Sequence, residues 1–354
     1  MQRLSRLLTF FYFDVLIGGL TRMQCWRYRA FARKAVPCAR SYQAGDERRI
    51  IRLFHIAFRK QKSLSRWRWE FLENPYETAN IVLLESDKAG IVGHYGGILV
   101  RFNFRGNVIP VCQIVDVMIH PAFRGRAVWD RLFRAYIQRS RDNGIKFLYG
   151  FNERVVARSN RRFFGAELAV VSEWVREIPH SLALRVPAND SPEIFPVARF
   201  DIHADALWER IKRSFPCATV RDSRYLNWRY SPRSDRKYVL WQAADPSSGR
   251  ILAMVVLGES ESDGLIFELL SEPDDAQSIA ALFRASIGHF SRAGKSRVRV
   301  WLSAHGTLRQ CAQAEGFRPV DSGFYLNLLS LDASLDAATV KESFYYTLGD
   351  YDVY

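Results

Sequence analysis

Apolar and polar residues in the first half of the chain follow two different periods. Apolar side chains recur close to every third or fourth position over 42–58, behind an Asp46 that can cap, and this spacing predicts an amphipathic helix. A second stripe of the same period runs over 127–143 and stops at Gly144, which predicts another helix. A third helix is expected over 154–164.

Runs rich in β-branched residues lie between these stretches. They are short and bounded by turn or polar residues, as the strands of a sheet are. The expected strands are 81–84, 90–100, 108–119, 147–151 and 169–175. Ahead of them, the segment 63–77 (SLSRWRWEFLENPYE) reads as an aromatic turn closed by Asn74-Pro75. The order of elements indicates an α/β unit with a mixed sheet.

The second half repeats this order. Arg224–Pro232 (RYLNWRYSP) parallels Arg68–Pro75 (RWEFLENP) at an offset of roughly 160 residues. After it come strands at 237–242, 250–257 and 264–270, a helix at 276–293, a strand at 297–302, a helix ending at Gly316 and a strand at 323–329. The shared order predicts a tandem duplication of one α/β unit.

The length of 354 residues also favours two domains, because a single core stops growing beyond roughly 250 to 300 residues. A stretch with several prolines (PHSLALRVPANDSPEIFP) separates the halves and reads as their connection. The expected organisation is an N-terminal extension at 1–40, a first domain at 41–178, a linker at 179–196, a second domain at 197–335 and a tail at 336–354.

Charge adds a preference for polyanions. The chain holds 51 Lys and Arg against 37 Asp and Glu, a formal charge of +14, which attracts nucleotide phosphates, nucleic acid or an anionic membrane face without choosing among them. A solvated basic face with no dedicated partner is an equal alternative. The five cysteines are far apart and form no C-x-x-C pair, and the histidines show no metal spacing. Neither disulfides nor a metal are therefore expected, and a reducing compartment fits.

The N-terminal segment Leu7–Leu20 is apolar, but it is shorter than the roughly 20 residues of a membrane-spanning helix. No small-residue cleavage site follows it, so a signal peptide is not expected either. A cytoplasmic location fits these features. With its basic neighbours, the segment 1–34 could lie on an anionic membrane surface; a helix packed on the domains is the alternative.

The most informative stretch lies between the strand 108–119 and the helix 127–143. The strand ends at a proline, a short basic loop with a glycine follows, and the helix starts directly after it. Amides of such a loop and of the first helical turn point the same way, and the helix dipole adds positive potential. This pattern predicts an anion site that would fit a pyrophosphate. A basic strand-to-helix turn without a ligand is the alternative.

At these residues the sequence resembles the GNAT acyltransferase superfamily. The family's loop, Arg/Gln-x-x-Gly-x-Gly/Ala, falls on Arg124, Gly125, Arg126, Ala127, Val128 and Trp129. Ala127 replaces the first glycine and Trp129 the last small residue, and a methyl at 127 is tolerated only if its φ is negative. Further likeness lies in the W-x-F…NP segment, Leu148–Asn152, Gly316-Phe317 and Leu348–Asp352.

The resemblance implies acetyl-CoA or another acyl-CoA as cosubstrate, without a metal. Backbone groups of Val117, Met118 and Ile119 would bind the pantetheine arm. Arg124, Arg126 and the amides of the loop 124–129 would hold the pyrophosphate. Asn152, at the end of the next strand, would face the thioester.

Catalysis in such a fold is mainly positioning, with a base for the amine and a donor for the thiolate. Asp116 could be the base, or a strand-face carboxylate paired with an arginine. Tyr149 could protonate the thiolate, or be a buried aromatic. The tyrosine that often precedes Gly-Phe in the family is absent from 161–166, where the sequence reads RRFFGA. The second half carries an acidic loop at 268–275, so this copy is expected to shape the acceptor cleft rather than bind CoA.

The leading hypothesis is an N-acyltransferase acting on an amine such as an amino sugar or a small amine, with nucleic acid an unlikely partner. The alternatives are an aminoacyl-tRNA-dependent peptidyl transferase of the tandem-GNAT type and a non-catalytic binding protein of the same fold. Oligomeric state, acyl chain length and acceptor leave no pattern in the sequence.

Overall fold

The computed structural model describes residues 36–76, 79–179, 192–232, 236–303 and 306–351. Contacts divide the chain into two compact units. Unit 1 contains the described residues of 36–69, 79–97 and 116–140, and unit 2 contains those of 70–76, 98–115 and 141–351. The expected extension 1–40 and linker 179–196 lie mostly outside the described residues.

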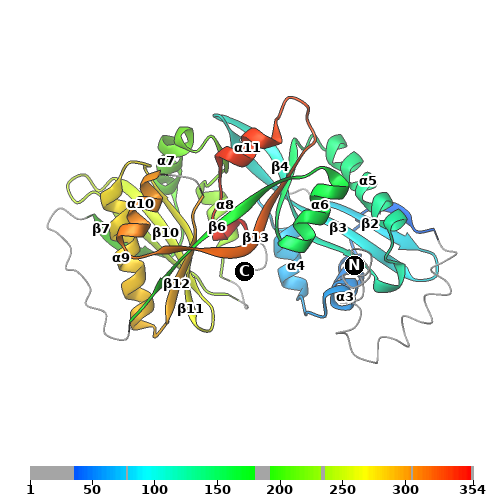
Figure 1. Cartoon of the computed structure of the whole chain (residues 1–354), viewed down its shortest axis with the longest axis horizontal. Helices are drawn as coiled ribbons and strands as arrows, with labels where there is room; N and C mark the ends of the chain where they lie inside the picture. Colours follow the sequence, from blue (N-terminus) through cyan, green and yellow to red (C-terminus); the bar gives the residue numbers. More distant parts are fainter. Residues whose placement is uncertain (1–35, 77–78, 180–191, 233–235, 304–305, 352–354) are drawn as a thin grey trace, which may run out of the picture. The chain divides into compact units, whose positions relative to one another are not determined.

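Unit 1 is a small antiparallel sheet covered by helices (Figure 1). Its strands β1 (Cys38–Ser41), β2 (Asn80–Ser86) and the first part of β3 (Gly90–Phe104) are neighbours in that order. It also contains the helix α3 (Glu47–Phe58) and the larger parts of α4 (Leu64–Phe71) and α5 (Arg126–Asp142). The ring of Tyr95 on β3 stacks on Tyr136 of α5, with 4.1 Å between the centroids, so α5 packs on the sheet through its predicted apolar face.

Unit 2 holds a larger mixed sheet. Its strands lie in the order β4 (Asn107–Ile119), β5 (Phe147–Glu153), β13 (Arg318–Ser330), β6 (Glu167–Glu177), β12 (Arg297–Trp301), β11 (Asp263–Ser271), β10 (Ile251–Glu259), β9 (Val239–Ala244) and β7 (Glu193–Val197). The pairs β4–β5 and β11–β12 are parallel, and the other neighbours along this order are antiparallel. The fold is therefore α/β with a mixed sheet, as predicted.

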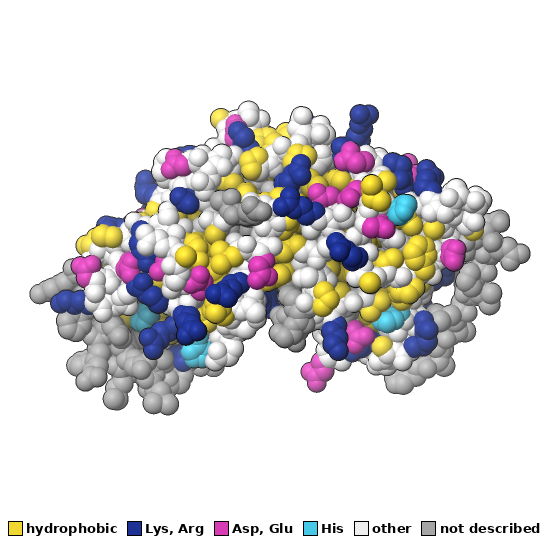
Figure 2. All heavy atoms as spheres, turned by 180° about the vertical axis from the view of Figure 1, so that it is seen from behind, with side chains coloured by type: hydrophobic (Ala, Val, Ile, Leu, Met, Phe, Trp, Pro, Cys, Tyr) yellow, Lys and Arg dark blue, Asp and Glu magenta, His cyan; other side chains and the backbone are white. Residues whose placement is uncertain are grey.

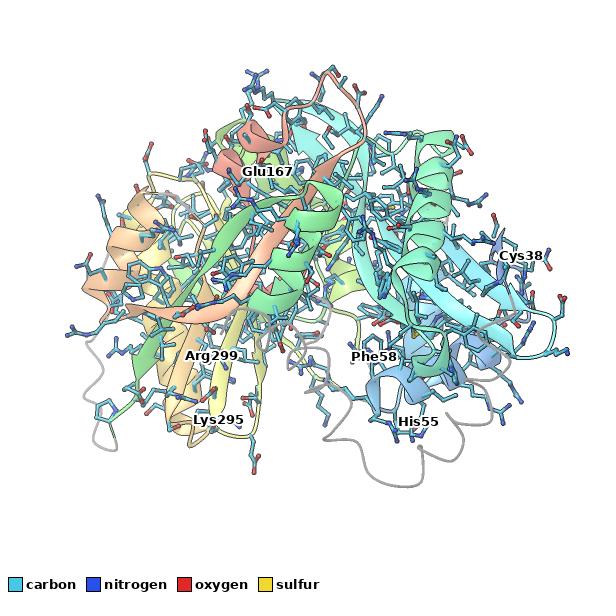
Figure 3. All side chains as sticks on the ribbon, turned by 45° about the vertical axis from the view of Figure 1, so that its right-hand side comes forward. Cys38, His55, Phe58, Glu167, Lys295 and Arg299 are labelled. Carbon is cyan, nitrogen blue, oxygen red and sulfur yellow. The ribbon has the colours of Figure 1, made fainter. Side chains whose placement is uncertain are left out.

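The last strand of each half lies beside a strand of the other half. Strand β13, from the second half, pairs with β5 of the first, and β6, from the first half, pairs with β12 of the second. An ion pair fastens the second exchange, because Arg299 Nε on β12 (labelled in Figure 3) donates to Glu173 Oε1 on β6 at 2.8 Å. The two halves are therefore interleaved in the sheet of unit 2.

The remaining elements of unit 2 come from the second half of the chain, apart from α6. They are α6 (Arg154–Phe164), α7 (Ile202–Ile211), η2 (Lys212–Ser214), β8 (Cys217–Thr219), α8 (Ser223–Arg229), α9 (Ala276–Arg292), α10 (Gly306–Ala314), α11 (Ala337–Ser343), β14 (Phe344–Tyr345) and η3 (Leu348–Asp350). Helix α9 packs on β10, β11 and β12, as Figure 1 shows. It has 17 residues, the same length as α5 at the corresponding place of the first half.

The C-terminal segment is part of the core of unit 2. Arg221, which is fully buried, donates to Asp350 Oδ2 at 2.6 Å and to Glu268 Oε1 at 3.2 Å. Gln113 Nε2 on β4 donates to the carbonyl oxygen of Asp350 at 2.5 Å. A buried charge is stable only when it is paired, as these groups are. The contacts also connect η3 to strands of both halves.

The predicted helices and strands are confirmed, with boundaries moved by a few residues. The aromatic turn over 63–77 is wrong, because α4 (Leu64–Phe71) is a helix there. Ser63 Oγ accepts from the amide of Arg66 at 3.1 Å and caps it, and Trp67 and Phe71, one turn apart, are buried. Asp46 precedes α3, but its carboxylate accepts from Arg40 instead of capping the helix.

Strands β1 and β7 were not expected from the sequence. Strand β7 pairs with β9 and ends the strand order, and an edge position is where a strand tolerates a proline such as Pro196. Such short edge strands carry little of the alternation that identifies a strand in a sequence.

Candidate donor-binding site

The loop after β4 is fixed at both sides. The amide of His120 donates to the carbonyl of Val92 on β3 at 2.8 Å, and the Nδ1 of His120 accepts from the amide of Ala122 at 3.2 Å. A short 3₁₀ turn, η1 (Pro121–Phe123), follows, and its Phe123 side chain is buried. Burial lowers the pKa of His120, and the charge of Arg124 adds to the shift, so both disfavour the imidazolium form.

The first turn of α5 offers amide donors to an anion. The amide of Trp129 donates to the carbonyl of Gly125 at 3.0 Å, which starts the helical ladder, so the preceding amides have no acceptor inside the helix. The first turn contains no acidic side chain, and residues 124–127 are exposed. The predicted loop therefore combines accessible amides, a helix N-terminus and positive charge in unit 1.

The first departure from the family loop, Ala127, is compatible with its backbone conformation. Among the described non-glycine residues only Arg59, Arg105 and Asp116 have a positive φ, so the methyl of Ala127 costs no backbone strain. Val128 and Trp129 lie half-buried in the first turn.

The two loop arginines differ in their contacts. Arg124 turns back, with Nε 3.3 Å from the carbonyl of Ile119 and a terminal nitrogen 3.5 Å from the carbonyl of Ala57. Ala57 lies in the last turn of α3, where Figure 3 labels His55 and Phe58. The side chain of Arg126 is 82% exposed, and its Nε lies 3.8 Å from Asp130 Oδ2. Arg126 is therefore the more available cation.

Asp116 is paired, but with a lysine instead of an arginine. Lys62 Nζ donates to Asp116 Oδ2 at 2.5 Å, and both side chains are more than nine-tenths buried. Within β4, Asp116 takes a left-handed φ of 52°. The next residues, Val117, Met118 and Ile119, complete the strand, and the side chains of Met118 and Ile119 are buried. Only their backbone is therefore available to a ligand.

Tyr149 and Asn152 belong to unit 2, whereas the loop belongs to unit 1. Tyr149 is 1% exposed, and its hydroxyl lies 3.4 Å from Thr219 Oγ1, which donates to Asp350 Oδ1 at 3.1 Å. Burial raises the pKa of Tyr149 well above its ordinary value, and Asp350 adds to the shift. Asn152 is half-buried on β5. The described pairing of β5 with β4 covers Cys112 and Gln113 of β4.

The corresponding loop of the second half has the opposite chemistry. The carboxylate of Asp275 accepts from the amide of Ser278 and caps α9. Glu272 Oε1 lies 3.2 Å from Arg210 Nε. The N-terminus of α9 is thus capped by an acidic side chain of its own loop.

Several polar residues of these sites gave no signal in the sequence. Lys62 lies in the connection after α3, His94 on β3, and Arg221 after β8, and none belongs to a recognisable pattern. Each acquires its partner from a distant part of the chain. These residues are recognised only from contacts between distant elements, and a local sequence pattern does not contain such contacts.

No group of three or more His, Cys, Asp or Glu among the described residues could hold a metal. Within the same part of the chain, no helix is long and apolar enough to cross a membrane. On the face drawn in Figure 2, Lys and Arg side chains are spread among Asp and Glu instead of forming one continuous stripe.

The fold is shared with GNAT acyltransferases, in agreement with the resemblance seen in the sequence. Residues 39–163 match the family model described as an acetyltransferase (GNAT) domain. A search of curated proteins finds no match to the chain.

Solved structures of GNAT proteins share the fold at low sequence identity. A probable N-acyltransferase of unknown function from Enterococcus faecalis is 13% identical, with a TM-score of 0.67 over 84% of this chain and 73% of that one. A GCN5-related N-acetyltransferase from Anabaena variabilis is 11% identical, with a TM-score of 0.66 and the same coverage. Saccharomyces cerevisiae N-myristoyltransferase, solved with myristoyl-CoA and inhibitors, is 12% identical, with a TM-score of 0.56 over 82% and 79%.

Proposed function

We propose that the chain is an N-acyltransferase that moves an acetyl or other acyl group from acyl-CoA to an amine. The observation that carries this proposal is the exposed, acid-free N-terminus of α5 behind the basic loop 124–126. Amides at a helix N-terminus bind phosphate oxygens, and arginines add charge-assisted hydrogen bonds. The pyrophosphate of the donor is expected here, with Arg126 as the principal side-chain contact.

The donor's pantetheine arm is expected along the end of β4, on the backbone of Val117, Met118 and Ile119. Their side chains turn into the core or lie half-buried, so the main chain is what the strand can offer. Asn152 is a further candidate for a contact near the thioester. Pantetheine carries amide groups, which suit such backbone donors and acceptors.

In the transfer step, the neutral amine attacks the thioester carbon, the C–N bond forms, the C–S bond breaks, and the thiolate takes up a proton. Asp116 is the candidate base for the amine, with its Oδ2 held by Lys62. Tyr149 is the weaker candidate for the acid, because its hydroxyl is buried beside Thr219. Positioning of donor and acceptor would supply most of the rate.

The acceptor is proposed to be an amine-bearing small molecule or sugar, and the cell compartment the cytoplasm. Cys38, Cys112, Cys217 and Cys311 are free thiols, which suits a reducing environment. Contact of residues 1–34 with a membrane surface stays a prediction, since these residues lie outside the described part of the chain.

The proposal is tested by incubating the protein with acetyl-CoA and a panel of amino sugars, polyamines and peptides. Acetylated products are detected by mass spectrometry, because the exposed thiol of Cys38 would react with a thiol reagent. Product with at least one amine, reduced by Arg126→Ala and kept by Arg134→Ala on the exposed face of the same helix, supports the proposal. Transfer from aminoacyl-tRNA but from no acyl-CoA would support the peptidyl-transferase alternative instead.

A further inference from the structure

Asp116 has an unusual backbone conformation for its place. Of the three described non-glycine residues with positive φ, Arg59 is the C-cap of α3 and Arg105 precedes Gly106 in the turn between β3 and β4. Asp116 instead lies inside a strand, at φ 52°. A non-glycine residue inside a strand adopts a left-handed conformation only where its surroundings enforce it.

The main chain of Asp116 is held by a buried histidine. The Nδ1 of His94, on β3, lies 2.7 Å from the carbonyl oxygen of Asp116, and His94 is 0% exposed. A carbonyl oxygen only accepts, so His94 carries its proton on Nδ1 and donates it. This hydrogen bond fixes the peptide group that leads from Asp116 to Val117.

The side chain of Asp116 is held independently by Lys62. The two charged groups are 2.5 Å apart, and their side chains are 7% and 8% exposed. The ammonium of Lys62 also lies 4.9 Å from the ring centroid of Phe54 on α3, which favours a cation there. A buried pair of this kind is strongly destabilised when one partner is removed.

We propose that His94 and Lys62 are positioning residues that keep Asp116 left-handed and thereby set the course of β4 through Val117–Ile119. A residue that breaks the pleat redirects the strand after it, as bulges next to functional sites do. The inference rests on the proposed function in one respect, namely that Val117–Ile119 receive the pantetheine arm. His94 and Lys62 act on the donor through Asp116 and do not touch it.

The test is a double-mutant cycle read by two measurements. His94→Ala is made in the wild type and in Lys62→Met/Asp116→Gly, where glycine adopts φ 52° without strain and no charge is left buried. The affinity for acetyl-CoA is measured by calorimetry and the melting temperature by circular dichroism. In the wild type, His94→Ala is expected to weaken binding about tenfold and to lower the melting temperature by about 5 °C. In the glycine background both effects should shrink to less than half.

Asp116→Asn and Asp116→Ala separate the backbone from the charge. Each change is made together with Lys62→Met, so that no charge is left buried without a partner. Asparagine tolerates the left-handed region better than alanine, so the asparagine variant should bind the donor more tightly than the alanine variant. If Asp116 is also the base, Asp116→Asn lowers kcat at unchanged KM.

The outcomes distinguish the inference from the function on which it rests. Equal effects of His94→Ala in both backgrounds, in binding and in melting temperature alike, would overturn the positioning role. Absence of acetyl-CoA binding by the wild type would overturn the proposed function, and the melting temperatures would still decide whether His94 enforces the conformation of Asp116.

Discussion

The carboxylate of Asp275 accepts a hydrogen bond from the backbone amide of Ser278 at 2.9 Å and so caps helix α9. Helix α5, of the same length and at the corresponding place of the first half, has no acidic residue in its first turn. The two helices thus have opposite N-termini: the carboxylate of Asp275 caps α9, whereas the exposed N-terminus of α5 carries no acidic side chain. Gly125 stands in α5 where Asp275 stands in α9.

Copying the second N-terminus onto the first should abolish the donor site. In Gly125→Asp the new carboxylate would cap α5 and repel the phosphates of the donor. The expected result is loss of acetyl-CoA binding at unchanged or slightly raised stability, measured by calorimetry and chemical denaturation. Gly125→Asn, which caps without charge, is the matched control and should weaken binding less. Unchanged binding by Gly125→Asp would contradict a phosphate site here.

The reverse change should affect stability alone. Asp275→Ala removes the cap of α9 and is expected to lower the free energy of unfolding by about 1 kcal/mol. Binding of acetyl-CoA should stay at the wild-type value, because α9 is not proposed to contact the donor. Denaturant titration and calorimetry on the same preparation measure both quantities, and a loss of affinity would show that the second loop takes part in binding.

The buried acid Glu268 should make stability depend on pH. Burial raises its pKa from 4.5 to about 7, with Arg221 opposing the shift and Asp350 adding to it. The folded protein therefore binds the proton more tightly than the unfolded chain, so Glu268 lowers the free energy of unfolding as pH rises from about 4.5 to about 7.

Glutamine does not titrate, so in Glu268→Gln the free energy of unfolding no longer falls with pH on account of this residue. The amide oxygen of the glutamine can still accept a hydrogen bond from Arg221, so the variant should have about the same free energy of unfolding as the wild type at pH 8. At pH 5 its free energy of unfolding should be lower than that of the wild type. Denaturant unfolding at pH 5, 6, 7 and 8 compares the two proteins. Parallel curves over this range would show that Glu268 is charged throughout.

The sequence predicted the regular elements because their periods are strong. The stripe of α5 and the β-branched runs of β2 to β4 appear at the predicted places. The segment 63–77 was misread because Trp67 and Phe71 look like an aromatic turn until Ser63 is seen to cap a helix. The exchange of β6 and β13 between the halves carries no local pattern, since each strand looks the same whichever neighbour it has.

The candidate site was predictable only where it is contiguous. The loop 124–129 lies in one stretch, so its amides, arginines and helix could be inferred together. The residues around Asp116 come from α3, β3 and the connection after α3, which are far apart in the sequence. Its left-handed φ could not be predicted either, because an aspartate in a strand, where this residue type is rare, does not by itself reveal its backbone conformation. Tyr149 was chosen for its position on β5, but its burial depends on residues of the second half.

Calorimetric titration with acetyl-CoA, at one salt concentration, tests the central claim most directly. The proteins are the wild type, Arg124→Ala/Arg126→Ala, and Arg134→Ala as a control for charge on the same helix. The account predicts micromolar binding by the wild type and by Arg134→Ala, and a loss of at least about tenfold in the double variant. No binding by the wild type, or equal affinities in all three proteins, would contradict a donor site at the start of α5.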